Sequence, residues 1–235
     1  MQYNIDFEIM GMMVTIVIAI AFRMNYVSRT RSDNAFMTLV YFILASQALD
    51  MITAYTFSLH KPSLNLINLI MTTGYFYCAF ATAVAFERYI ASYIHAPRRK
   101  SYHVLRFSIV VLYCIHGLLN PFTRLAFYFT EDGSYVHGAF YYVGYIAPGL
   151  FELAALYQIL RYRKYFSKKQ WISSVAFLVI VAGTMILQAT ILTDVYLTFG
   201  TIPVALLMIM MSLETPDYRK LTQTLEELEE AKQEA

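Results

Sequence analysis

Ionisable and amide side chains recur inside apolar stretches of the chain, and these are the residues that could do chemistry. The candidate ligand-binding residues share this setting; they are Glu8, Asp50, Asn68, His116, Asn120, Glu152 and Gln188. Polar groups are costly to hold inside a bilayer, which makes them functional candidates. The carboxyl groups of Asp50 and Glu152 are the strongest, because a buried carboxylate must be paired, protonated or hydrated. For the amides, the alternative is interhelical hydrogen bonding, worth about 0.6 kcal/mol per bond.

Seven long apolar stretches must position these side chains. They cover residues 5–24, 35–58, 64–86, 104–122, 138–160, 171–193 and 195–213. The length of each stretch is close to that of a helix that crosses a hydrocarbon core of about 30 Å, which takes about 20 residues. The sequence therefore predicts an all-α membrane protein, in which residues 1–213 form a bundle of seven transmembrane helices.

The positive charges predict how this bundle is oriented. Of the 18 Lys and Arg residues, all but Lys61 and Arg124 fall on the same alternate connections. Short loops rich in Lys and Arg stay in the cytoplasm, so the N-terminus is expected outside and the C-terminus inside a plasma membrane crossed several times. Most of the candidate residues then lie in the outer half, and Glu152 lies deeper. We expect a water-filled cavity that opens to the outside.

A hairpin is expected between the fourth and fifth stretches, at about 121–138. Residues 125–129 and 134–136 are rich in aromatic side chains and flank Glu131, Asp132 and Gly133. An Asp-Gly step between such runs is a strong signal for a β-hairpin with a type I′ turn. The predicted orientation places this hairpin outside the cell, where it could cover a ligand.

Several kinds of chemistry are not supported by the sequence. The seventh stretch has no lysine for a retinal Schiff base, and no metal-hydrolase or serine-hydrolase motif occurs. His116 alone among the histidines lies within an apolar stretch, which is too few for a haem or metal site. The net charge of +2 arises from the Lys and Arg residues in the connections on one side of the bundle, and it does not indicate a surface for nucleic acid. We expect no catalytic residue, metal or cofactor: the chain is a binder rather than an enzyme.

Residues 214–235 differ sharply from the rest and predict a cytoplasmic coiled-coil linker. The candidate relay residues in this segment repeat at coiled-coil spacing; they are Tyr218, Leu221, Leu225 and Leu228. Two heptads are too short to be stable alone, and a solvated amphipathic tail is the alternative. The sequence ends in helix-favouring residues with no cap, so we expect the protein to continue into an output domain and to dimerise through this helix. Pro203, in the seventh stretch, is the expected lever of the relay.

Two resemblances are visible in the sequence. Glu87, Arg88 and Tyr89 resemble the Glu/Asp-Arg-Tyr motif of animal G-protein-coupled receptors, but the chain lacks their Asn-Pro-x-x-Tyr motif. Four segments in order resemble the N-terminal seven-helix sensor regions of bacterial signalling proteins; they are residues 3–8, 120–123, 127–138 and 214–218. The second resemblance covers nearly the whole chain. It implies a membrane region that precedes a histidine kinase or a diguanylate cyclase.

The expected function is that of a sensory receptor domain. An unknown small molecule, outside or in the membrane, would bias two packings of the bundle, and a dimeric helix would relay the change to a histidine kinase or, second, to a diguanylate cyclase. The main alternative is a small transporter. A carrier built from two repeats should show helix breaks at matching positions, and Pro148 has no counterpart in the first stretch. A scaffolding role would leave the costly intramembrane carboxyl groups without use.

Overall fold

The computed structural model describes residues 6–25, 30–59, 61–94, 100–190 and 198–213. Seven α-helices and one two-stranded sheet make up most of this described part. The helices are α1 (Asp6–Asn25), α2 (Arg31–Ser58), α3 (Asn65–Ser92), α4 (Lys100–Thr123), α5 (Val143–Arg161), α6 (Lys168–Thr190) and α7 (Thr198–Ser212). The strands are β1 (Phe127–Phe129) and β2 (Tyr135–His137), and two short 3₁₀ helices cover Pro62–Leu64 and Arg163–Tyr165.

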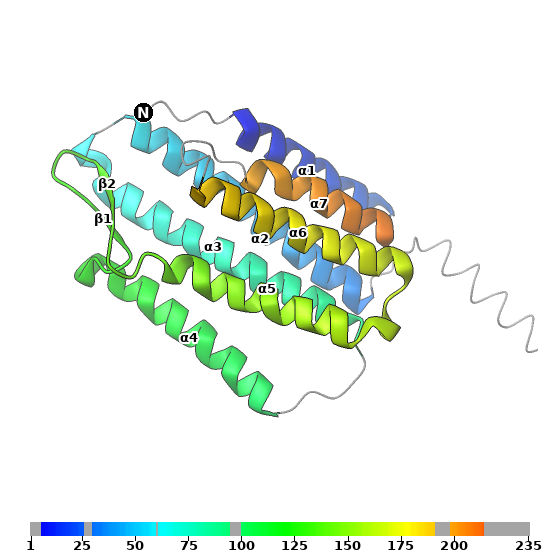
Figure 1. Ribbon diagram of the computed structural model, residues 1–235. Helices are drawn as coiled ribbons and strands as arrows, with labels where there is room; N and C mark the ends of the chain where they lie inside the picture. The colour runs from blue at the N-terminus through cyan, green and yellow to red at the C-terminus, as the bar shows by residue number, and fades with distance from the viewer. Residues whose placement is uncertain (1–5, 26–29, 60, 95–99, 191–197, 214–235) are drawn as a thin grey trace, which may run out of the picture.

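The helices lie side by side in one bundle with the hairpin at one end (Figure 1). The most extensive contacts are between α2 and α3, followed by α6 with α7, α3 with α5, and α1 with α7. Helix α4 lies at the edge of the bundle, and only Tyr113 and Asn120 of its residues are buried. The all-α class predicted from the sequence is confirmed.

Five helical segments are long and apolar enough to cross a membrane. They are Arg31–Ser58, Pro62–Ser92, Lys100–Thr123, Val143–Arg161 and Lys168–Leu187, and Gly200–Ser212 is a shorter apolar helix. Their outward faces carry large apolar side chains: Phe107 is 70% exposed and Phe122 is 85% exposed. Such faces are unfavourable in water and suit a hydrocarbon solvent. The fold is therefore compatible with a multi-pass membrane protein.

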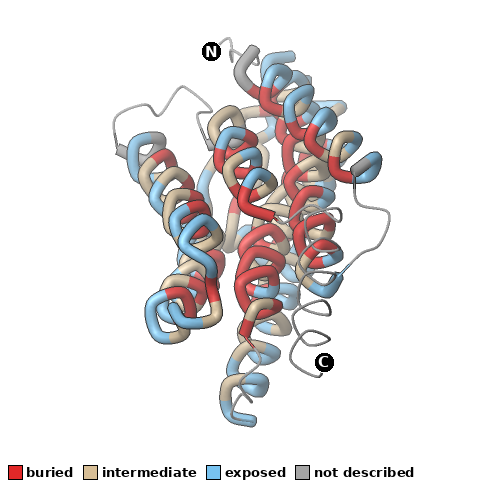
Figure 2. The backbone as a smooth tube through the Cα atoms, turned by 90° about the vertical axis from the view of Figure 1, so that its right-hand side faces the viewer, coloured by how far each residue is buried: buried red, intermediate tan, exposed pale blue. Residues whose placement is uncertain are grey.

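The apolar core is concentrated in the half of the bundle away from the hairpin, and Figure 2 shows buried residues along the inward faces of the helices. Phe22, Phe36, Tyr89 and Ile209 of four different helices are fully buried there. Tilted aromatic contacts join Phe22 to Phe36 and Phe36 to Tyr89, with ring centroids 5.0 and 6.2 Å apart. The larger apolar cluster of the protein, which includes these side chains, therefore lies in this half of the bundle.

Helix α2 starts at a capping box that the sequence encodes locally. The amide of Asp33 donates to the Thr30 hydroxyl at 3.3 Å, and the Asp33 carboxylate accepts from the Thr30 amide at 2.9 Å. These bonds satisfy backbone donors that the first turn of a helix leaves without partners. At the other end of α2, Pro62 stands at the start of the 3₁₀ turn that leads into α3, where its missing amide costs nothing.

The predicted hairpin is present, but its turn differs from the expectation. Phe127 pairs with His137 and Phe129 with Tyr135 in antiparallel register. A type I′ turn needs positive φ at both central residues, and here Gly133 alone in the loop has it, with φ 84°. The Gly133 amide donates to the Thr130 carbonyl at 3.0 Å. The turn is thus a three-residue loop that ends in a left-handed glycine, and the type I′ prediction was wrong.

The predicted apolar stretches match the helices closely, with two informative differences. Helix α3 continues past residue 86 to Ser92 and includes Glu87, a charged residue that ended the predicted apolar stretch but is buried in the structure. Helix α5 begins at Val143 instead of residue 138, because the chain first turns back under the hairpin. A Cβ at Gly138 would collide with the carbonyl oxygens of Arg124 and Leu125, so glycine is required at this close approach.

Candidate functional site

Buried polar side chains of α1, α2 and α3 gather in the half of the bundle near the hairpin. The set, called the polar cluster below, consists of Glu8, Gln47, Asp50, Asn68 and Thr72, and each is at most 4% exposed. On α2, Gln47 and Asp50 are three residues apart, and on α3 Asn68 and Thr72 are four apart, so each pair shares one helix face. Gly74 of α3 packs beside Leu49 of α2, so Thr72 lies near the level of Asp50, and Asn68 lies about one helical turn nearer the hairpin.

The polar cluster contains two acidic groups and buried oxygens without partners. The carboxyl groups of Glu8 and Asp50 are close enough to repel each other when both are charged. Within the described residues, Asp50 Oδ2, Asn68 Oδ1 and Thr72 Oγ1 accept or donate no hydrogen bond. A buried polar atom without a partner costs about 1–3 kcal/mol, and more if charged. The cluster is therefore suited to receive a proton, a cation or hydrogen-bond donors of a ligand.

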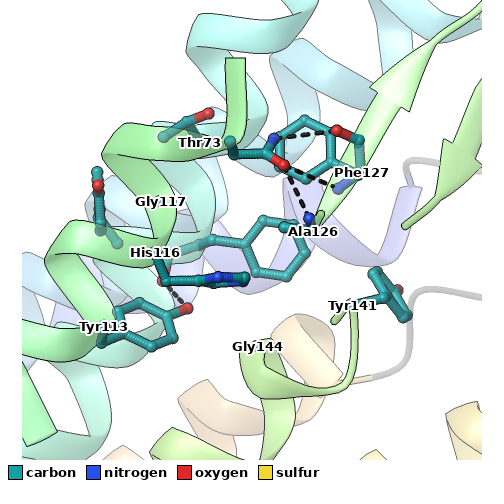
Figure 3. A pocket seen from close by; sticks show the side chains of 11 residues that line it. Thr73, Tyr113, His116, Gly117, Ala126, Phe127, Tyr141 and Gly144 are labelled. Atoms are coloured by element: carbon teal, nitrogen blue, oxygen red, sulfur yellow. Dashed lines mark hydrogen bonds between the residues drawn. The ribbon is translucent and has the colours of Figure 1, made fainter. Parts of the chain in front are cut away.

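A small hollow lies beneath the hairpin, separate from the polar cluster, and Figure 3 shows it from close by. Its walls come from α3, α4, β1 and the start of α5, and His116 points into it. Its volume is about 20 Å³. A water molecule needs about 10–15 Å³ on this measure, so the hollow has room for about one water molecule and is too small for an organic ligand. His116 Nε2 is buried there and has no hydrogen-bond partner in the described part of the chain.

Asn120 fixes the hairpin above this hollow. Its side-chain oxygen accepts from the amides of Ala126 and Phe127 at 2.8 and 3.2 Å, and its Nδ2 donates to the Phe127 carbonyl at 3.0 Å. Asn65 of α3 adds a bond to the Thr130 carbonyl at 2.9 Å. The side-chain amide of Asn120 is thus engaged in hydrogen bonds to the start of the hairpin, so Asn120 positions the hairpin.

Aromatic rings attach the hairpin to the helices. Phe57 of α2 packs on Phe129 and Tyr135, with centroids 5.2 and 5.4 Å away. Phe76 of α3 stacks on Phe127 at 5.6 Å. At the base of the hairpin, His137 stacks on Tyr141 at 3.6 Å. Contact with these rings removes water from His137, so partial burial lowers the pKa of its imidazole. The hairpin is thus held to α2, α3 and the start of α5.

The other predicted residues are spread over the molecule. Glu152 lies half-buried on α5, and no described hydrogen bond or ion pair joins it to the polar cluster. Pro203 is buried within α7. The side chain of Gln188 lies outside the described residues, as do Tyr218, Leu221, Leu225 and Leu228. Of the seven candidate ligand residues, Glu8 and Asp50 lie close to each other, and Asn68 is buried on the neighbouring helix α3. His116 and Asn120 form a separate pair on α4.

The sequence analysis missed a charged network at the opposite end of the bundle. Glu87 is fully buried on α3 and forms an ion pair with Arg106 of α4, with Oε2 and Nε 3.2 Å apart. Its Oε1 accepts from the Tyr102 hydroxyl at 2.6 Å and from Gln158 Nε2 of α5 at 2.7 Å. The sequence did contain a signal for this network, because Glu87 directly follows one apolar stretch and the oppositely charged Arg106 lies within the next. Because buried charges are paired, the two were candidate partners.

Comparison with known proteins adds no family. The chain matches no protein-family model, and no curated protein or solved structure is significantly similar to it. Among the described residues, no group of three or more His, Cys, Asp or Glu side chains could hold a metal ion. The function is therefore argued from the polar cluster and its place in the bundle.

Proposed function

We propose that the chain is the membrane-embedded receptor part of a signalling protein. It crosses a plasma membrane seven times, with the N-terminus and the hairpin outside and the C-terminus in the cytoplasm. The distribution of Lys and Arg supports this orientation, since all but Lys61 and Arg124 fall on the cytoplasmic side. A small molecule, external or in the membrane, is the signal. The output is a histidine kinase or, second, a diguanylate cyclase.

The main support for this proposal is the position of the polar cluster between helices that also contact α7. Glu8 and Asp50 place two acidic groups between α1 and α2, in the outer half of the proposed bundle. Helix α1 packs along α7 as well as α2. A ligand, a cation or a proton at the cluster would change how α1 sits on α2. Because α1 also contacts α7, that change reaches the helix that leads to the cytoplasmic segment.

The relay needs two packings of the bundle that differ in their affinity for the signal. A ligand shifts such an equilibrium only by its difference in affinity, and a full switch takes about 5.5 kcal/mol. Helix α7 has features that suit this role. Pro203 interrupts its backbone hydrogen bonding, and the Ser212 hydroxyl accepts from Ser173 of α6 at 2.9 Å. This hydrogen bond joins the far end of α7 to α6.

A fusion to a reporter kinase tests this proposal. Residues 1–235 are joined in heptad phase to the cytoplasmic part of a histidine kinase, and autophosphorylation is measured in membrane vesicles. Asp50→Asn removes the repulsion with Glu8 and should change the autophosphorylation rate at least threefold, about 0.65 kcal/mol of bias. Glu131→Gln is the matched control, because it removes an exposed carboxylate of the hairpin loop.

Two outcomes would reject the receptor proposal. The first is an equal autophosphorylation rate for the parent chain, Asp50→Asn and Glu131→Gln. The second concerns the proposed coiled coil: Leu221→Asp combined with Leu225→Asp should abolish the effect of Asp50→Asn while the membrane bundle stays folded. An unchanged effect in that double variant would show that the helix does not relay the signal.

A further inference from the structure

An open groove runs along the side of the bundle between α2, α3 and α4. It has a volume of about 400 Å³. That is twenty times the hollow beneath the hairpin and within the range of about 300–1,000 Å³ typical of ligand sites. Its walls are apolar apart from a few groups, and they include Phe42 of α2, Phe80 and Val84 of α3, and Val110 and Leu118 of α4.

Two arginines stand at one end of this groove. Arg88 lies one helical turn beyond Val84 on α3, and Arg106 lies one turn before Val110 on α4. Both are at the end of the bundle opposite the hairpin. From Arg106 to Leu118 the groove follows α4 for 12 residues, or about 18 Å. This length is close to the about 15 Å of hydrocarbon in one leaflet of a bilayer.

The charges at this end are not balanced within the groove. Arg106 is paired with the buried Glu87 through Nε. Arg88 is exposed and has no ion-pair partner among the described residues. The groove therefore combines a net positive end with a long apolar wall. Helix α4 forms one wall of the groove, and its outer face presents Leu105 and Phe107 to the surroundings, 61% and 70% exposed. An occupant would enter from the lipid phase and not from water.

We propose that this groove binds one anionic glycerophospholipid. The phosphate lies at the guanidinium groups of Arg88 and Arg106, and one acyl chain lies between α3 and α4 toward Leu118. Arginine suits phosphate because its planar fork offers several donors to the oxygens. A second copy of the chain fits less well, because its own arginines would bring further positive charge to this end. The proposal depends on placement in a membrane and not on a signalling role.

Native mass spectrometry of the purified full chain tests lipid binding directly. Delipidated protein in detergent is mixed with equal amounts of phosphatidylglycerol and phosphatidylcholine that have the same acyl chains. The expected result is one bound phosphatidylglycerol in clear preference to phosphatidylcholine. Arg88→Gln should weaken phosphatidylglycerol binding about tenfold, a usual effect of losing one charged hydrogen bond. Arg161→Gln, which removes an exposed arginine at the same end of α5, should leave binding unchanged.

A second variant separates the acyl chain from the head group. Ala81→Phe fills the apolar wall of the groove and should weaken binding of both lipids, while thermal unfolding confirms that the variant is folded. Equal retention of the two lipids, or equal binding by Arg88→Gln and the unchanged chain, would overturn the proposal. Displacement of the lipid by glycerol 3-phosphate at equal concentration would also overturn it, since the head group alone would then account for binding.

Discussion

Single side chains decide how the hairpin is attached, and Asn120 is the most important of them. Its amide makes three hydrogen bonds to Ala126 and Phe127. Asn120→Ala would leave these backbone groups without partners, so we expect a loss of about 1–3 kcal/mol in the stability of the hairpin. Amide hydrogen exchange of Ala126 and Phe127 in lipid nanodiscs measures this as faster exchange. Asn120→Asp keeps an accepting oxygen for the two amides but sets its second oxygen against the Phe127 carbonyl, so it should recover only part of the loss. Equal exchange in all three proteins would contradict the assignment.

The hairpin loop should also respond to acid through Asp132. Its carboxylate accepts from the hydroxyls of Thr130 and Ser134, and these hydrogen bonds lower the pKa of Asp132 below its usual 3.8. A group whose pKa is lowered by folding contributes its stability above its ordinary pKa and loses it as the pH falls below. The loop should thus keep its structure at pH 5 and loosen only below about pH 4. Asp132→Ala should show fast exchange of the Ser134 amide already at pH 7; slow exchange would contradict this role.

At the scale of helices, the Glu87 network holds α4 to the bundle. Helix α4 buries little of its own surface, yet Tyr102 and Arg106 bind Glu87, and Gln158 of α5 joins them. Arg106→Gln removes the arginine that pairs with the buried Glu87 carboxylate and should cost about 3 kcal/mol of stability. Adding Glu87→Gln removes that charge and should restore part of the loss. Thermal unfolding in nanodiscs measures both; an additive double variant would show that the two residues do not interact.

At the scale of the whole molecule, the proposed orientation makes a direct labelling prediction. Cys78 and Cys114 are replaced by alanine, and single cysteines are placed at Glu131 in the hairpin loop or at Lys169 at the opposite end, both exposed. A membrane-impermeant maleimide should label Glu131→Cys in intact spheroplasts and Lys169→Cys only after the membrane is opened. The reverse pattern would invert the orientation inferred from the charges.

Much of the fold could be predicted from the sequence, and the site only in part. The helices follow from hydropathy, because the length and composition of each apolar stretch are local properties of the chain. The hairpin followed from the Asp132-Gly133 step, although its turn type was wrong, because loop length depends on which strand residues pair. Glu8, Asp50 and Asn68 could be chosen as polar residues in apolar helices. Two features could not be predicted: the separation of these residues from Glu152, and the pairing of Glu87 with Arg106. Both depend on which helices pack together, and a single sequence does not show this.

The central claim is that the polar cluster controls the position of α7, and a distance measurement tests it without knowledge of the ligand. Spin labels are attached to cysteines at Asn34 of α2 and Met211 of α7, which are exposed near the same end of the bundle. Double electron–electron resonance then gives the distribution of distances between them in nanodiscs. The account predicts a shifted distribution for Asp50→Asn and none for Glu131→Gln. Superimposable distributions for all three proteins would contradict it.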